Sequence, residues 1–200
     1  MDRKVCASAA RYHVCVDHGT NNLSRRPNQE ELDAVSLSGV DLTGVVLRKI
    51  NLEGRDLRGT SFADAVLNDV NFDNAQLEGA NFSGAELDGS RFVGADLRGA
   101  ALGGVRGESV DFSNAQLQES NFSDSDLGNV TFTGAVLDGA NLERARWVQV
   151  VGERLSARGV VAKNWVLDDA KLSGSDFEDA NCCNCVWQFV DAQDARLVGV

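Results

Sequence analysis

The chain has 200 residues, of which 24% are charged and 43% hydrophobic, with a formal net charge of -11 at pH 7. This is the composition of a single globular domain and excludes a disordered or fibrous chain. No apolar run approaches the roughly 20 residues of a transmembrane helix, and the N-terminus lacks the apolar stretch of a secretory signal. We therefore expect a cytoplasmic protein that repels nucleic acid and suits basic protein partners.

Residues 1–34 are expected to form a non-repeating N-terminal cap. Tyr12–Val16 alternates as a short strand does, and residues 19–28 are rich in loop-forming types. Asn28 followed by Glu31 three positions later is typical of a capped helical turn. A solenoid needs such a cap because its end exposes unpaired backbone and apolar surface.

The cap also holds the two histidines of the chain, His13 and His18, near Cys6 and Cys15. These residue types bind zinc, but their spacing lacks a paired Cys-x-x-Cys or His-x-x-x-His element. We interpret them as packing and surface residues and expect no metal or other cofactor.

Between residues 56 and 142 a bulky apolar residue recurs at every fifth position, with one exception at Gly107, and the frame can be followed from residue 35. A period of five is that of neither a helix nor a strand. We call the bulky position i. The residue at i-2 is usually small, Asp or Asn is common at i-1, and Gly is common at i+2. Gly, Asp and Asn tolerate left-handed backbone, so each unit should contain one corner and two inward side chains. The predicted core consists of Leu57, Phe62, Leu67, Phe72, Leu77, Phe82, Leu87, Phe92, Leu97, Phe112, Leu117, Phe122, Leu127, Phe132, Leu137 and Leu142.

These tandem units closely resemble the pentapeptide repeat family, whose shorthand is A(D/N)LXX. Residues 75–99, AQLEG-ANFSG-AELDG-SRFVG-ADLRG, match it unit after unit. The resemblance covers about four fifths of the chain and implies an all-β fold, a right-handed quadrilateral β-helix with four units per coil. The frame runs without insertion to Gly199, which gives 33 units and about eight coils over residues 35–200.

Some units depart from the pattern, notably between residues 150 and 164. There the bulk moves two positions back, so that Val150 precedes Gly152, just as Val105 precedes Gly107. Packed cores tolerate exchanges that conserve volume. We therefore expect repacked coils in this region and no loop.

The five cysteines are odd in number and unevenly placed, which fits free thiols better than a disulfide framework. Cys182-x-x-Cys185 has the spacing of a metal-binding pair. In the five-residue frame, however, both cysteines fall at inward positions, where they would pack as small hydrophobes. We favour packing over zinc, with Cys183 pointing outward, because no further ligands are adjacent in the sequence.

Outward apolar residues gather near the C-terminal end. They are Val166, Val186, Phe189, Val198 and Val200. Positions 166 and 186 are twenty residues apart and would stack on one face of a four-sided coil. This patch predicts a homodimer through the C-terminal end; the alternative is a scatter of surface valines.

The sequence shows no nucleophile with its base, no carboxylate pair and no phosphate-binding glycine loop, so we expect no enzyme activity. It predicts an acidic rod that serves as a protein-interaction scaffold. The resemblance offers an alternative, because quinolone-resistance members mimic duplex DNA, bind DNA gyrase and protect it from fluoroquinolones.

The distribution of charge weighs against this alternative. Duplex DNA carries one charge per ~1.7 Å, about twice the density of this rod. The outward charges of the four faces sum to between -2 and -4, with Arg55 as an inward-pointing exception. No face is strongly acidic.

Overall fold

The computed structural model describes residues 5–9, 12–16, 27–33 and 36–199. Within the predicted cap, His18 lies outside the described residues, and so does Val200 of the predicted apolar patch.

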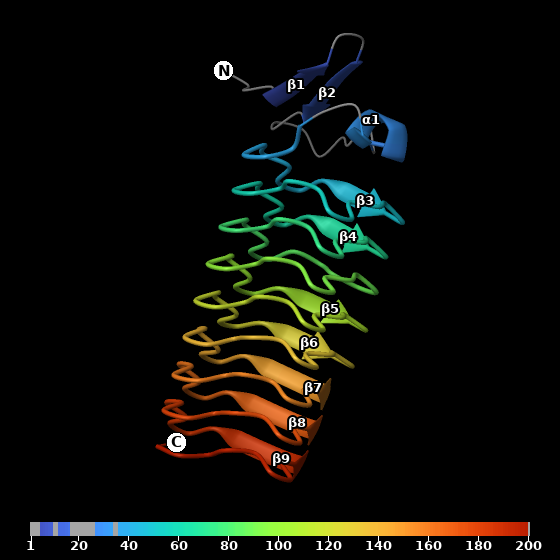
Figure 1. The fold of residues 1–200 in the computed structure, drawn as a ribbon. Helices are drawn as coiled ribbons and strands as arrows, with labels where there is room; N and C mark the ends of the chain where they lie inside the picture. Colours follow the sequence, from blue (N-terminus) through green and yellow to red (C-terminus); the bar gives the residue numbers. More distant parts are fainter. Residues whose placement is uncertain (1–4, 10–11, 17–26, 34–35, 200) are drawn as a thin grey trace.

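The five-residue units stack into four-sided coils, because residues twenty apart in the sequence pair in parallel. On one face, seven successive parallel pairings lead from Val46 to Val186. The chain thus makes about seven turns between its first and last crossing of this face, against the eight coils predicted. Figure 1 shows the coils as successive levels of one rod.

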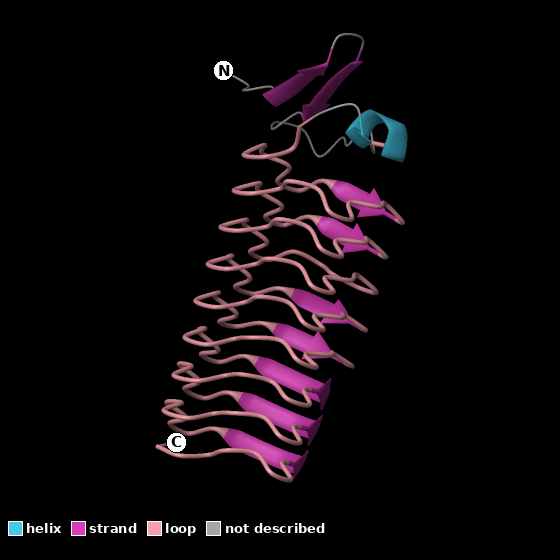
Figure 2. Ribbon diagram, in the orientation of Figure 1, coloured by secondary structure: helices cyan, strands magenta, loops and turns pink. Residues whose placement is uncertain are grey.

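The strands are short because each face of a coil holds only a few residues. Before the rod come β1 (Val5–Ala9), β2 (Tyr12–Val16) and α1 (Gln29–Asp33). The strands of the rod are β3 (Val46–Arg48), β4 (Val66–Asn68), β5 (Arg106–Glu108), β6 (Asp126–Gly128), β7 (Arg146–Val151), β8 (Val166–Lys171) and β9 (Val186–Asp191). β1 and β2 pair antiparallel, whereas β5 to β9 form a parallel sheet in chain order along one side of the rod (Figure 2).

Each unit turns its corner at position i+2. All 33 of these residues, from Gly39 to Gly199, have a φ angle between 47° and 78°; 15 are glycines, and most of the other 18 are Asp or Asn. The Asp or Asn at i-1 also fixes the turn, because its side chain accepts the backbone N–H two residues on, as Asn81 does from Ser83 at 3.0 Å. The uninterrupted frame predicted from the sequence is confirmed over this range.

The bulky residues fill the interior of the rod. Each of the sixteen core residues selected from the sequence has at most 1% of its surface exposed. Rings one coil apart stack, with centroids 4.8 Å apart for Phe72 and Phe92 and 5.0 Å apart for Phe62 and Phe82. The two columns of rings meet edge to face, as Phe72 and Phe82 do at 5.7 Å. Because the interior is filled, a binding partner can contact only the outer sides and the ends of the rod.

Residues 150–164 form regular coils, as predicted. The sequence predicts that a bulky residue in the same unit fills the space beside each glycine. In the structure, residues of other units also fill it. A Cβ atom at Gly152 would come within 2.9 Å of Leu172 in the next coil, and one at Gly107 within 2.8 Å of Val110. The next unit and the next coil therefore supply the missing volume as well.

Candidate interaction surface at the C-terminal end

The helix α1 covers the N-terminal end of the rod and makes contacts that a further coil would make. The Gln29 side chain accepts the N–H of Asn51 at 2.7 Å and donates to its carbonyl at 2.7 Å. Leu32 is fully buried and extends the core. The guanidinium of Arg55, a residue predicted to point inward, donates to the carbonyl of Leu32 and to Asp33, both at 3.0 Å, and its side chain is 25% exposed.

The C-terminal end is different, because no described element covers β9. This strand pairs with β8 on one side only. Trp187, Cys185 and Val190 point toward the core but are only partly buried, and the indole N–H of Trp187 has no partner among the described residues. A strand edge beside a partly exposed core favours the addition of another chain.

Exposed apolar side chains surround this edge. They are Val186 (42% exposed), Phe189 (83%), Leu197 (46%) and Val198 (54%), and we call them the end surface. Val166 of the predicted patch is only half-exposed within β8. Sequence reasoning missed Leu197 because this position is buried in the coils before it.

Phe189 is unusual in both conformation and exposure. It occupies a corner with a φ angle of 51°, where most other units place Gly, Asp or Asn. Left-handed backbone is unfavourable for a large side chain, and the exposed ring gains little from burial within its own chain. A strained residue of this kind points to a functional contact.

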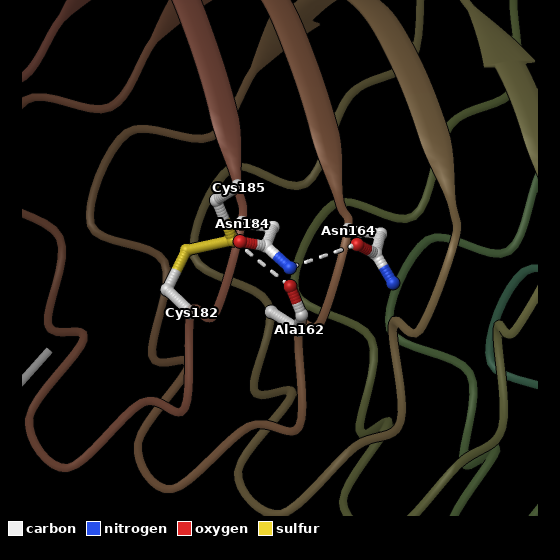
Figure 3. The surroundings of a disulfide bond; sticks show 5 residues. All are labelled: Ala162, Asn164, Cys182, Asn184 and Cys185. Carbon is white, nitrogen blue, oxygen red and sulfur yellow. Dashed lines mark hydrogen bonds between the residues drawn. A yellow bond between two sulfur atoms is a disulfide. The ribbon is translucent and has the colours of Figure 1, made fainter.

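Cys182 and Cys185 form a disulfide bond in the last described coil (Figure 3). This corrects the prediction that both are free thiols packed as small hydrophobes. One corner, at Asn184, separates the two inward positions and leaves their Cα atoms 5.4 Å apart, within bonding reach. Cys183 is an exposed free thiol, as expected. In the described part of the chain, no group of three or more His, Cys, Asp or Glu residues could hold a metal ion.

Ion pairs within the chain engage many of the acidic side chains. Arg91 lies 2.9 Å from Asp73 and 3.4 Å from Asp111. The guanidinium of Arg58 hydrogen-bonds Asp56 and lowers the pKa of that carboxyl group to about 2. The rod thus offers fewer free carboxylates than the 30 acidic residues of the chain suggest.

Comparison with known proteins bears on the fold. The family model for pentapeptide repeats matches in eight copies, over residues 36–74, 47–84, 65–104, 110–146 and 166–200. No curated protein sequence matches the chain, and no helix among its described residues is long and apolar enough to cross a membrane.

Two solved structures that match the chain are distant from it in sequence. Trypsin-treated QnrB1, a plasmid-mediated fluoroquinolone resistance protein, is 19% identical with a TM-score of 0.63; the match covers 78% of this chain and 85% of QnrB1. HetL, a pentapeptide repeat protein involved in heterocyst differentiation regulation in the cyanobacterium Nostoc sp. strain PCC 7120, is 20% identical with a TM-score of 0.44. That match covers 80% of this chain and 88% of HetL. At these identities the likeness to QnrB1 extends to the fold alone.

Proposed function

The chain belongs to the pentapeptide repeat family, and on this basis we propose that it is a non-enzymatic interaction scaffold that joins a second copy through its end surface. Its acidic sides would then face a protein partner. The observation that carries the proposal is the difference between the two ends. Gln29 satisfies the backbone at the N-terminal end, while β9 presents an edge and exposed apolar side chains at the other.

A second copy supplies what the end surface lacks. Two β9 edges related by a two-fold axis could pair their backbone groups and cover Phe189 and Leu197 together. Burial of apolar surface contributes about 25 cal/mol per Å², and a closed two-fold contact is the commonest form of homo-oligomer. The strain at Phe189 would then be offset by contacts in the dimer.

Sedimentation velocity over about 1–100 μM, the range of weak to moderate self-association, tests the dimer. We expect a dimer in the wild type and a monomer in Phe189→Asp. Val161→Asp is the matched control, because Val161 is 37% exposed but does not belong to the end surface. A wild-type protein that stays monomeric throughout would refute this part of the proposal.

A DNA gyrase-binding mimic of duplex DNA is the second candidate. The net charge of -11 favours it, and an end-to-end dimer would double the charged length. The ion pairs of Arg58 and Arg91 weigh against it, because they engage carboxylates that a mimic would present to the enzyme. We therefore place it second to the scaffold.

Supercoiling by purified gyrase, titrated with the protein with and without a fluoroquinolone, separates the candidates. A mimic should inhibit the enzyme or protect it from the drug, and added salt should weaken either effect. Absence of any effect on gyrase from the host organism would reject the mimic and leave the scaffold.

A further inference from the structure

We propose that Cys182 and Cys185 form a reversible dithiol–disulfide site that exchanges with low-molecular-weight thiols such as glutathione. The site lies in the last described coil, beside β9 (Figure 3). A second copy on the end surface would restrict access to the bond, so the site is tested at low protein concentration, where the chain is monomeric and the result does not depend on the dimer.

In the oxidised state, the bond fits the repeat without disturbing it. The coil keeps its parallel pairings on both sides of the cysteines, Val161 with Asn181 and Val166 with Val186. The corner at Asn184 keeps its left-handed φ angle of 58°. The disulfide thus joins two neighbouring inward positions that the frame has already brought together.

The reduced state also fits the repeat, because a Cys185 thiol would have a hydrogen-bond acceptor. The Cys185 sulfur lies 2.9 Å from the carbonyl oxygen of Ala162 (Figure 3), 23 residues earlier in the chain. A disulfide sulfur has no proton to donate, but a thiol has. Earlier coils show the equivalent hydrogen bond with a hydroxyl donor across the same 23 residues: Thr60 to Leu37, Ser90 to Leu67 and Ser175 to Gly152, each at 2.6 Å.

Small thiols can reach the bond because it lies at the exposed end of the rod. Cys182 and Cys185 are both partly exposed, whereas Ser175, at the position equivalent to Cys185 two units earlier, is 1% exposed. Thiol–disulfide exchange requires access of a thiolate to one sulfur. The last described coil provides this access, and a coil inside the stack would not.

Reduction would proceed in two exchange steps. A glutathione thiolate attacks the Cys182 sulfur; the disulfide breaks, and its electron pair leaves on the Cys185 sulfur. The Cys185 thiolate takes a proton from water and, as a thiol, donates a hydrogen bond to the Ala162 carbonyl. A second glutathione thiolate attacks the glutathione sulfur of the mixed disulfide. This releases oxidised glutathione and the Cys182 thiolate, which is protonated. Oxidised glutathione drives the reverse sequence.

Equilibration of the folded full-length chain in glutathione buffers of graded ratio, without denaturant, tests the site. After an acid quench and alkylation, peptide mass spectrometry counts the free thiols at each position. We expect Cys182 and Cys185 to titrate together and reversibly, with an unchanged far-ultraviolet circular dichroism spectrum. A bond that is reduced only after denaturant is added, or a repeat that unfolds on reduction, would overturn the proposal.

Two variants sharpen the result. Cys183→Ser should leave the titration unchanged, because Cys183 is an exposed free thiol outside the disulfide. Cys185→Ser should stay folded, because its hydroxyl can donate to Ala162 as Ser175 donates to Gly152. At oxidising ratios it should hold Cys182 as the mixed disulfide with glutathione, because no second thiol remains to displace the glutathione. A Cys183→Ser variant that loses the transition would assign the exchange to a different pair.

Discussion

The corner residues are constrained by the neighbouring coil as well as by their own backbone. The carboxylate of Asp64 leans over Gly84, one coil later, where a Cβ atom would lie 2.5 Å from its oxygen. Asn74 lies over Gly94 in the same way, at 2.8 Å. Glycine at these corners therefore serves two purposes, since it adopts the positive φ angle and leaves room for the Asp or Asn stacked on it.

Phe189 is a corner residue that is not Gly, Asp or Asn, and its replacement by Asn should stabilise the monomer. Phe189→Asn puts a residue that tolerates left-handed backbone at a φ angle of 51° and removes a ring that is 83% exposed. We expect the free energy of unfolding of the monomer to rise by about 1 kcal/mol. Chemical denaturation at low protein concentration measures it.

Asp169→Asn is the control for this change, because Asp169 occupies the same corner one coil earlier with a φ angle of 52°. It exchanges one tolerant residue for another and should have little effect. If Phe189→Asn were instead destabilising, the ring would be contributing to the fold of its own chain, and the case for a partner contact would fail.

Two buried serines allow a matched test of hydrogen bonding. Ser175 donates to the Gly152 carbonyl at 2.6 Å and accepts the N–H of Leu155 at 3.1 Å. Ser120 is equally buried, but its hydroxyl has no partner among the described residues. Ser175→Ala should lower the free energy of unfolding by about 1–3 kcal/mol, whereas Ser120→Ala should be neutral or stabilising. Equal losses in thermal or chemical unfolding would show that the hydrogen bonds of Ser175 add nothing.

At the scale of the coil, the sequence predicts the period, the corners and the inward positions, because each is repeated many times. What it does not predict depends on contacts between coils. The amide of Gln29 replaces a strand only once Asn51 is placed beside it. The Cys182–Cys185 bond was missed because an odd count of cysteines favoured free thiols, although two inward positions across one corner were a usable signal.

A double-mutant cycle can test whether Val110 fills the space beside Gly107. A Cβ atom there would lie 2.8 Å from Val110 and 3.2 Å from Leu87, so Gly107→Ala should be destabilising by about 1–3 kcal/mol through overpacking. Val110→Ala alone should destabilise by leaving a cavity. Because Val110→Ala makes room for the added methyl group and this methyl group fills part of the cavity, the double variant should lose less stability than the sum of the two. Strict additivity in denaturation experiments would contradict this packing.

The ion pair of Asp56 with Arg58 predicts a dependence on pH. The pKa of Asp56 is lowered from 3.8 to about 2 in the folded chain, chiefly by the hydrogen bond from Arg58. A depressed pKa contributes stability above about pH 4, and this contribution is lost as pH falls toward 2. Asp56→Asn keeps an acceptor for the backbone of Arg58 but removes the charge. It should be slightly less stable than the wild type at pH 7, and the difference should shrink as pH falls through about 2.

High salt is the control, because both side chains are exposed and their attraction is screened. In 1 M salt the difference at pH 7 should shrink. A difference between Asp56→Asn and the wild type that is as large at pH 2 as at pH 7 would have to come from the turn and not from the charge.

At the scale of the whole molecule, the rod is a stack in which each coil contacts only its neighbours. Stability in such a stack is the sum of the coils and their interfaces. An interior coil has two interfaces, the first has one coil and α1, and the last described coil has one coil only. The two ends are therefore unequal for a physical reason, which does not require any difference in the repeat itself.

Amide hydrogen exchange should reveal this inequality. Local opening follows the number of buried contacts, so we expect slow exchange around Phe92 and Phe112, intermediate exchange in β3, which lies toward α1, and the fastest exchange of the rod in β9. Reduction of the Cys182–Cys185 bond should raise the rate in β9 and leave β3 unchanged. A rise in protein concentration should lower the rate in β9 if a second copy covers the end surface. If β9 were as protected as β3 in dilute, reduced protein, the C-terminal coil would be held by contacts within its own chain, and neither the dimer nor the disulfide would be needed to order it.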